Sequence, residues 1–383
     1  MASKDNISEE QLISQLVWRC EREIRGMVKL SPPPSPVALE RESLPSSLGY
    51  LDVLPTEVSS MILNMLDLRS LSRVLRASFK GKRTVEALPA WQDIREHAPT
   101  VLPALGGTQL IKYHSISLVY QTLRESRCVS CFEFGGFLFM PTCERVCYEC
   151  LFRNDGLWVV GLDDAEYYFR LTVDQLQQIP IMQTIPGTYR VRKHKVSWEI
   201  VCPLVSVKQA KKLAIEIHGS PEKLEEIRPK GSPPRSDMSD FNRFPAAPLE
   251  PPGSDMSRLQ GPSREDLVIY DERGGLASLR FPSLTKSGAD WGYLCVGCRF
   301  MYDLHIDGIM PKEVWSEHCA PGVVAKTPLQ ALQTKLYSRD EFPTHIQNCF
   351  GAQHRLEKYG RGRVDWDNEP RSSANVPESE DSE

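Results

Sequence analysis

The chain has 383 residues, of which 41% are hydrophobic and 25% charged, and these values fit a soluble globular protein with two or more domains. Its formal net charge of −4 argues against a dominant role in binding nucleic acid or anionic membranes. No apolar run reaches the roughly 18 residues of a membrane span, and the polar start MASKDNISEE lacks the apolar core of a signal peptide. We therefore expect a cytoplasmic or nuclear protein whose 11 cysteines are metal ligands or free thiols rather than disulfides.

Residues 1–47 are expected to contain one helix and a linker. Apolar residues recur near helical spacing from Leu12 to Ile24, and Ser8 is placed to cap that helix. The proline-rich stretch 31–36 is typical of an extended spacer, although such stretches also serve as ligands of SH3-type domains.

Two short amphipathic helices are predicted within residues 51–79. Pro55 fits the first turn of a helix, where its missing N–H removes no hydrogen bond, and Glu57 follows where the helix dipole favours negative charge. More apolar side chains are present than one small inner face needs, which indicates a surface covered by another protein. The apolar face of the first helix comprises Val58, Met61, Ile62, Met65 and Leu66, and that of the second comprises Leu71, Val74, Leu75 and Phe79.

The run LPTEVSSMILNMLDLRSLSRV resembles the F-box, a three-helix module that docks on the Skp-type adaptor of cullin–RING ubiquitin ligases. The resemblance implies an F-box-like domain at residues 48–100, with a third helix from about Pro89 to His97. The run RASFKGKRTVEALP departs from the family pattern, which leaves the register of the third helix open. The alternative is an ordinary helical hairpin packed into the core of this chain. The docking surface that the resemblance implies comprises Leu54, Pro55, Val58, Ile62, Leu66, Leu71 and Val74.

Residues 108–218 are expected to form a mixed α+β region held by a metal. We predict that Thr108 caps a helix that continues to Arg124. Two C-x2-C pairs follow, separated by 15 residues, which is zinc-ribbon-like spacing, and the run GGFLF between them indicates a hairpin strand. The predicted ligands of a structural zinc ion are Cys128, Cys131, Cys147 and Cys150.

Other interpretations of these cysteines remain open. They could be buried structural thiols or a thioredoxin-type redox pair, although a redox C-x2-C usually occurs alone. Cys143 is a fifth candidate, either as a free buried thiol or as a replacement for Cys147. Four thiolates would leave no open coordination position, and the predicted site is therefore structural rather than catalytic.

The rest of this region gives weaker signals. Thr172 and Gln175 have the spacing of a capping box at a helix N-terminus, and Ser206 is placed to cap a helix that continues to His218. The run 189–196 alternates like a strand with a basic side, which we interpret as solvated. Residues 219–265 are rich in proline, serine and glycine and are predicted to be a disordered linker, with a strand expected at 267–270.

A second Cys/His region is predicted at residues 266–360. Cys295 and Cys298 form another C-x2-C pair, and His345 and Cys349 share one face of a helix opened by a predicted capping box of Ser338 and Glu341. The predicted second zinc ligands are Cys295, Cys298, His345 and Cys349, with His318-Cys319 as a rival for the second pair.

The fold class expected from these elements is α+β: a small all-α F-box-like unit, a zinc-stapled mixed region with a disordered insert, and an acidic disordered tail at 361–383. The cysteine motifs also resemble those of a fungal F-box family over most of residues 51–359. This resemblance implies a non-catalytic ligase adaptor that binds an unknown protein target. Alternatives are a zinc-dependent or thiol-based enzyme and a zinc protein unrelated to ubiquitin. We do not expect a nucleic-acid-binding zinc finger, because the sequence lacks a basic helix that could read bases. We do not expect a RING-type ligase, because the sequence lacks eight interleaved metal ligands.

Overall fold

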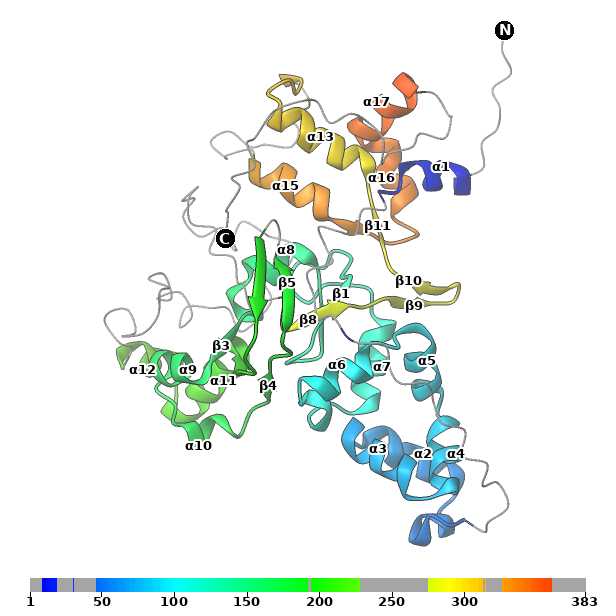
Figure 1. Cartoon of the computed structure of the whole chain (residues 1–383), viewed down its shortest axis with the longest axis vertical. Coiled ribbons are helices and arrows are strands. Elements are labelled where there is room, and N and C mark those ends of the chain that lie inside the picture. Colours follow the sequence, from blue (N-terminus) through cyan, green and yellow to red (C-terminus); the bar gives the residue numbers. More distant parts are fainter. Residues whose placement is uncertain are drawn as a thin grey trace. The chain divides into compact units, whose positions relative to one another are not determined.

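The computed structural model describes residues 9–18, 30, 46–191, 194–227, 275–312, 314 and 326–359 (Figure 1). Helices and small antiparallel sheets both occur, which confirms the α+β class. The chain divides into a large unit, Cys20–Gly292, and a small unit made of Met1–Arg19 and Tyr293–Glu383. The predicted proline-rich spacer, most of the linker, the strand at 267–270 and the acidic tail lie outside the described residues.

The large unit begins with short helices that include the predicted F-box-like segment. The run that departs from the F-box pattern forms a helix of its own, α4, because the Ser78 side chain accepts a hydrogen bond from the Gly81 N–H at 3.0 Å and caps it. The third predicted helix is therefore α5, which begins at Pro89 as expected. The elements are η2 (Gly49–Val53), α2 (Thr56–Met65), α3 (Leu68–Ala77), α4 (Phe79–Glu86) and α5 (Pro89–His97).

The predicted helix from Thr108 to Arg124 is wrong. Thr108 ends a helix instead, and its hydroxyl donates to the Ala104 carbonyl at 2.8 Å. The next long helix begins eight residues after Thr108, at Ile116, where the Ser115 side chain accepts from the Leu118 N–H. The elements here are α6 (Val101–Gly107), η3 (Leu110–Lys112) and α7 (Ile116–Arg124).

A three-stranded antiparallel sheet of order β2-β1-β8 follows. Leu138 of β1 lies opposite Arg145 of β2 on one side and Leu279 of β8 on the other. Residues 275–292 therefore belong with the large unit, although the sequence grouped them with the second cysteine region. The elements are β1 (Phe137–Phe139), β2 (Glu144–Val146), α8 (Tyr148–Arg153), η4 (Asp155–Leu157), β8 (Ser278–Arg280), β9 (Ser283–Thr285) and β10 (Gly288–Asp290).

A second antiparallel sheet, of order β3-β7-β4, shares a core with helices α9 and α11. The capping box of Thr172 and Gln175 is confirmed at the start of α10. The predicted single strand at 189–196 is wrong, because this run forms the hairpin of β5 and β6. The elements are β3 (Val159–Gly161), α9 (Leu162–Phe169), α10 (Val173–Leu176), β4 (Ile181–Gln183), β5 (Gly187–Val191), β6 (His194–Trp198), β7 (Pro203–Ser206) and α11 (Val207–His218).

The predicted linker does not begin at residue 219. Residues Pro221–Glu226 form helix α12, which Ser220 caps by accepting from the Lys223 N–H, and its Leu224 side chain is buried in the core beneath α11 and α9. The sequence pattern did not indicate this helix, because Leu224 is a single large apolar side chain in a segment otherwise rich in proline and serine.

The small unit joins the two ends of the chain. The N-terminal helix buries Leu16 among the C-terminal helices, and the Trp18 N–H donates to the Leu294 carbonyl at 2.8 Å. The predicted reciprocal bonds between Ser338 and Glu341 are confirmed at 3.1 and 3.2 Å. The elements of the small unit are α1 (Glu9–Leu16), β11 (Tyr293–Leu294), α13 (Val296–Ile306), α15 (Lys326–Thr334), β12 (Leu336–Tyr337), α16 (Phe342–Asn348) and α17 (Phe350–Tyr359).

Candidate metal centres and an exposed apolar ledge

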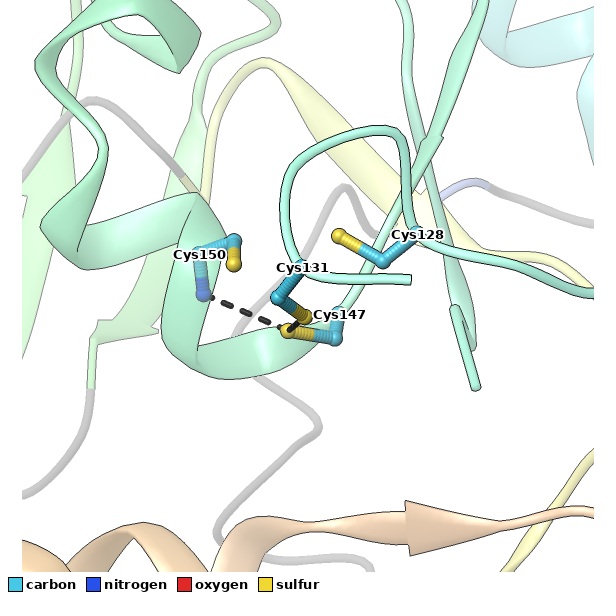
Figure 2. Close-up of side chains that lie close together, drawn as sticks. All are labelled: Cys128, Cys131, Cys147 and Cys150. Atoms are coloured by element: carbon cyan, nitrogen blue, oxygen red, sulfur yellow. Dashed lines mark hydrogen bonds between the residues drawn. The ribbon is translucent and has the colours of Figure 1, made fainter. Parts of the chain in front are cut away.

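The first candidate metal centre lies in the large unit. The sulfur atoms of Cys128, Cys131, Cys147 and Cys150 all lie within 4.8 Å of one another, and Figure 2 shows a loop carrying one pair facing the start of a helix that carries the other. The Cys131 and Cys147 sulfurs are 3.6 Å apart. A tetrahedral ion with metal–sulfur bonds of about 2.3 Å would separate its sulfurs by about 3.8 Å. The four donors are therefore close to the arrangement that such an ion requires.

Local backbone geometry produces each half of this centre. The loop after Cys128 closes through a bond from the Phe132 N–H to the Cys128 carbonyl at 3.0 Å, with Phe132 in the left-handed region at φ +61°. The Ser130 N–H donates to the Cys128 sulfur at 3.4 Å. On the other side, Cys147 caps α8 and accepts from the Cys150 N–H at 3.4 Å. A backbone N–H therefore donates to a cysteine sulfur in each half of the centre.

Hydrogen bonding among the thiols distributes the negative charge unequally. Bonds from Cys131, Cys147 and Cys150 hold the pKa of Cys128 well below its usual range. The same network raises the pKa of Cys147 and of Cys150, first through their bonds with Cys128. Four thiolates packed this closely repel one another unless a cation lies among them. The chemistry of the donor set therefore fits a metal ion that prefers sulfur.

Cys143 lies outside this group. It is buried at φ +55° beside Thr122, whose hydroxyl donates to the Cys143 carbonyl at 2.9 Å. Burial raises the pKa of the Cys143 thiol to about 12, so that it is neutral and poorly reactive. The structure groups Cys147, and not Cys143, with the other three sulfurs.

The second candidate metal centre lies in the small unit. Cys295, Cys298, His345 and Cys349 place their donor atoms within 4.8 Å of one another, as the spacing of the two pairs predicted. The Cys298 sulfur lies 3.3 Å from Nε2 of His345, and the Cys295 sulfur lies 3.9 Å from that of Cys349. These distances identify Nε2 as the histidine atom directed at the site. The rival pair His318-Cys319 lies outside the described residues.

Secondary structure positions these four donors. Cys295 precedes α13 and Cys298 lies in its first turn, whereas His345 lies on α16 and Cys349 follows its last residue. The Tyr337 ring stacks on His345, with ring centroids 3.8 Å apart and planes inclined by 14°. This contact holds the imidazole plane in place, as supporting residues around metal ligands commonly do.

Hydrogen bonding among the thiols also makes their pKa values unequal at the second centre. Bonds from Cys295 and Cys298 lower the pKa of Cys349. The bond with Cys298 lowers the pKa of Cys295, but the bond with Cys349 and burial together outweigh it and raise this pKa to about 12. Over the described part of the chain each centre groups four donors, which is the number that fills a tetrahedral coordination shell.

Arg145 braces the hairpin that joins the first two ligand pairs, and nothing in its sequence position predicted this role. Its side chain is fully buried and donates to four carbonyls, with N···O distances of 2.6 to 3.2 Å. The guanidinium also lies 4.9 Å from the centroid of the Phe281 ring. Burial lowers its pKa to about 9. The accepting carbonyls belong to Thr122, Gly135, Phe281 and Pro282.

The predicted docking residues are placed unequally. Leu54, Pro55 and Val58 are exposed, whereas Ile62, Leu66 and Val74 are half-buried. Leu71 is fully buried in the core of its own unit, so that its assignment to a docking surface is wrong. The face of α2 that turns inward carries Ser59 and Leu63. Leu63 was not among the residues that the helical pattern selected.

An apolar ledge remains on η2 and on the outer face of α2, to which we give the name Leu-Pro ledge. Tyr50 is 97% exposed and Met65 79% exposed, which is unusual for side chains of this size. Met61 and Met65 lie one helical turn apart, on the same side as Val58. The members of the Leu-Pro ledge are Tyr50, Val53, Leu54, Val58, Met61 and Met65.

Comparisons of the chain with protein-family models, with curated proteins and with solved structures give no match. Among the residues that the structure describes, no helix combines the length and the apolar character needed to cross a membrane.

Proposed function

We propose that the chain is a non-catalytic adaptor of a Skp–cullin–F-box ubiquitin ligase, which docks through its Leu-Pro ledge and presents a target protein. The observation that carries this proposal is the ledge itself. Six apolar side chains are exposed along η2, at Leu54 and along α2, the first elements of the segment that resembles an F-box. Apolar side chains gathered in this way are a common feature of protein-binding surfaces.

The docking surface of this proposal differs in detail from the one the resemblance implied. Leu71 points into the core and supports the surface from beneath, whereas Met61 and Met65 join Val58 on the outside. Methionine is flexible and polarizable, and a partner can pack against it in several geometries. The contact area therefore runs along η2 and α2, with α3 contributing less.

The metal in both centres is assigned as zinc in this proposal. Four cysteines, or three cysteines and one histidine, in a tetrahedral arrangement are the ligand sets of structural zinc sites. Cys128, Cys131, Cys147 and Cys150 would hold one ion, and Cys295, Cys298, His345 and Cys349 the other. Zinc contributes folding energy there, so that the units around it can serve as rigid target-binding surfaces in the cytosol or nucleus.

An adaptor of this kind acts by positioning. It raises the effective concentration of target lysines near the ubiquitin-carrying subunit of the ligase, and this requires no catalytic side chain of its own. The closed donor sets support this assignment over a metalloenzyme, because neither offers an open coordination position.

Co-purification with a Skp-type adaptor tests the proposal. Wild-type protein is expected to retain the adaptor, and the double variant Leu54→Asp, Val58→Asp is expected to lose it while keeping its far-UV spectrum. The matched control is Ile200→Asp, Val201→Asp, which places the same charges on two apolar residues that are 72% and 53% exposed elsewhere in the large unit. The control should retain the adaptor. Failure of wild-type protein to bind it, or equal retention by both double variants, would contradict the proposal.

A further inference from the structure

Helices α3 and α4 carry a strong and one-sided charge. Between Leu68 and Val85 the sequence contains six basic residues and no acidic residue. Arg69, Arg73 and Arg76 follow one another at intervals of four and three residues, and side chains at these intervals are neighbours on one helical face. We call these three residues the arginine row. The surrounding chain is weakly acidic overall, so that this stretch is a local departure rather than a general feature.

The arginine row is available to a partner. All three side chains are exposed. Arg76 donates from Nε to the Ser72 carbonyl at 3.1 Å, within its own helix. Among the described residues no ion pair involves the arginine row, nor Lys82 or Arg83 on α4. Three cations on one helical face repel one another, and an anionic partner would relieve that repulsion.

The basic helices are continuous with the Leu-Pro ledge. Asp52 of η2 forms an ion pair with Lys80 of α4 at 2.8 Å, and the Lys80 N–H donates to the Ser46 hydroxyl at 2.8 Å. The Ser59 hydroxyl of α2 donates to the Leu51 carbonyl of η2, so that α2 is tied to the same segment. The η2 end of the Leu-Pro ledge is therefore fixed to the start of α4, and α4 packs in turn on α3, which carries the arginine row.

The mixed chemistry of this surface selects a class of partner. A nucleic acid would satisfy the cations, but it would leave the apolar side chains of the ledge exposed to water. A helix that binds an anionic membrane carries its basic and apolar faces together, whereas here the basic residues lie on α3 and α4 and the exposed apolar ones on η2 and α2. A protein with an apolar patch bordered by carboxylates satisfies both halves.

We infer that the partner docking on the Leu-Pro ledge is an acidic protein, and that the arginine row steers its approach. This inference rests on the proposed function, because it concerns the same docking surface. Charges at the border of an interface act mainly on the association rate, whereas apolar contacts at its centre act mainly on the dissociation rate. The two halves of the surface are thus expected to have separable kinetic effects.

Association kinetics with a purified Skp-type adaptor test the inference. The rate constant is measured for the full chain by stopped flow between about 50 mM and about 300 mM NaCl, a range over which surface charges become screened. The test variant is Arg69→Glu, Arg73→Glu, Arg76→Glu. The matched control is Lys112→Glu, Lys212→Glu, Lys286→Glu, which makes the same change in net charge at exposed lysines outside this surface. If the test variant does not fold, glutamine replaces glutamate at the same positions.

The wild-type association rate should fall steeply with salt, and the test variant should associate at least about tenfold more slowly at low salt, with a nearly unchanged dissociation rate. The control should behave as wild-type protein. Equal association rates and salt slopes for the test variant and wild type would overturn the inference while leaving the proposed function intact. Absence of wild-type binding would overturn both. Tight binding of wild type to a duplex oligonucleotide or to phosphatidylserine vesicles, lost in the test variant, would assign the arginine row to those partners instead.

Discussion

Gly297 of α13 and Gly351 of α17 lie with backbone against backbone, so that a Cβ atom on either residue would overlap main-chain atoms of the other helix. Neither glycine is needed for an unusual backbone angle. Their role is close approach, which brings the start of α13, with Cys295 and Cys298, up to the start of α17, which follows Cys349. The geometry of the second candidate metal centre thus depends on the absence of a Cβ atom at both positions.

Gly351→Ala is therefore expected to destabilise the small unit. Overpacking usually costs about 1–3 kcal/mol, and here the overlapping atoms are backbone atoms that cannot rotate away. Thermal unfolding should show a lower midpoint, and the metal content should fall. Gly106→Ala is the matched control, because a Cβ atom there would meet nothing within 4 Å, and it should leave both quantities unchanged or raise stability slightly. An unchanged midpoint and metal content for Gly351→Ala would contradict this account of the contact.

Cys131→Ser should release the metal of the first centre. The binding energy of a structural zinc ion, about 10–16 kcal/mol in small zinc domains, contributes directly to folding. Metal content per chain, measured by mass spectrometry of the purified protein, should fall, and unfolding should begin at lower temperature. Cys143→Ser removes a buried thiol from the same hairpin without touching the donor set, and its metal content should match wild type. Equal metal content in both variants would exclude Cys131 as a ligand.

Arg145→Met should destabilise the large unit by roughly 3–5 kcal/mol, because it leaves four buried carbonyls without their donors. Arg145→Lys should recover only part of this loss, since an ammonium group cannot reproduce the fork of the guanidinium. Urea unfolding measures the free energy of unfolding of both variants. Arg124→Met serves as the control, because Arg124 is exposed and should contribute little. A loss below about 1 kcal/mol for Arg145→Met would show that the brace is dispensable.

His114 should contribute a measurable part of the acid sensitivity of the large unit. Its Nε2 lies 2.7 Å from the Met140 carbonyl oxygen, and burial lowers its pKa below the ordinary value of 6.5. The unfolded chain therefore binds a proton near pH 6.5 that the folded chain does not bind, and the free energy of unfolding falls as the pH drops further. One such group gives a slope of at most about 1.4 kcal/mol per pH unit.

His114→Gln removes the titrating group and keeps a side chain that can donate to the Met140 carbonyl. Urea unfolding from pH 7 to pH 5 should therefore show a shallower decline in the variant than in wild type. Metal release also depends on pH, but it affects both proteins equally because His114 is not among the grouped donors. Parallel pH profiles would show that His114 is not responsible.

The cysteine sites were predictable because their geometry is local. A C-x2-C pair folds into one tight loop, and His345 with Cys349 spans one helical turn, so that spacing alone identified each pair. The capping boxes were predictable for the same reason, since each joins residues three apart. The pairing of Cys295 and Cys298 with His345 and Cys349 was inferred from ligand chemistry, and the structure brings them together.

Packing between distant segments was not predictable. The direction of Leu71 depends on what α3 packs against, and the helical pattern alone could not distinguish an inner from an outer apolar face. The burial of Leu63 and the end of α6 at Thr108 likewise depend on packing against distant segments. Arg145 gave no sequence signal, because its partners are carbonyl oxygens that every residue carries.

The packing of α1 against the helices that follow Tyr293 has a consequence for the order of folding. The whole large unit, Cys20–Gly292, lies in the sequence between the two segments that form the small unit. Contacts between segments so far apart in sequence carry a large loop-closure entropy, whereas most contacts of the large unit are made within one continuous segment. We therefore expect the small unit to assemble late, after the large unit has shortened the distance between its two segments.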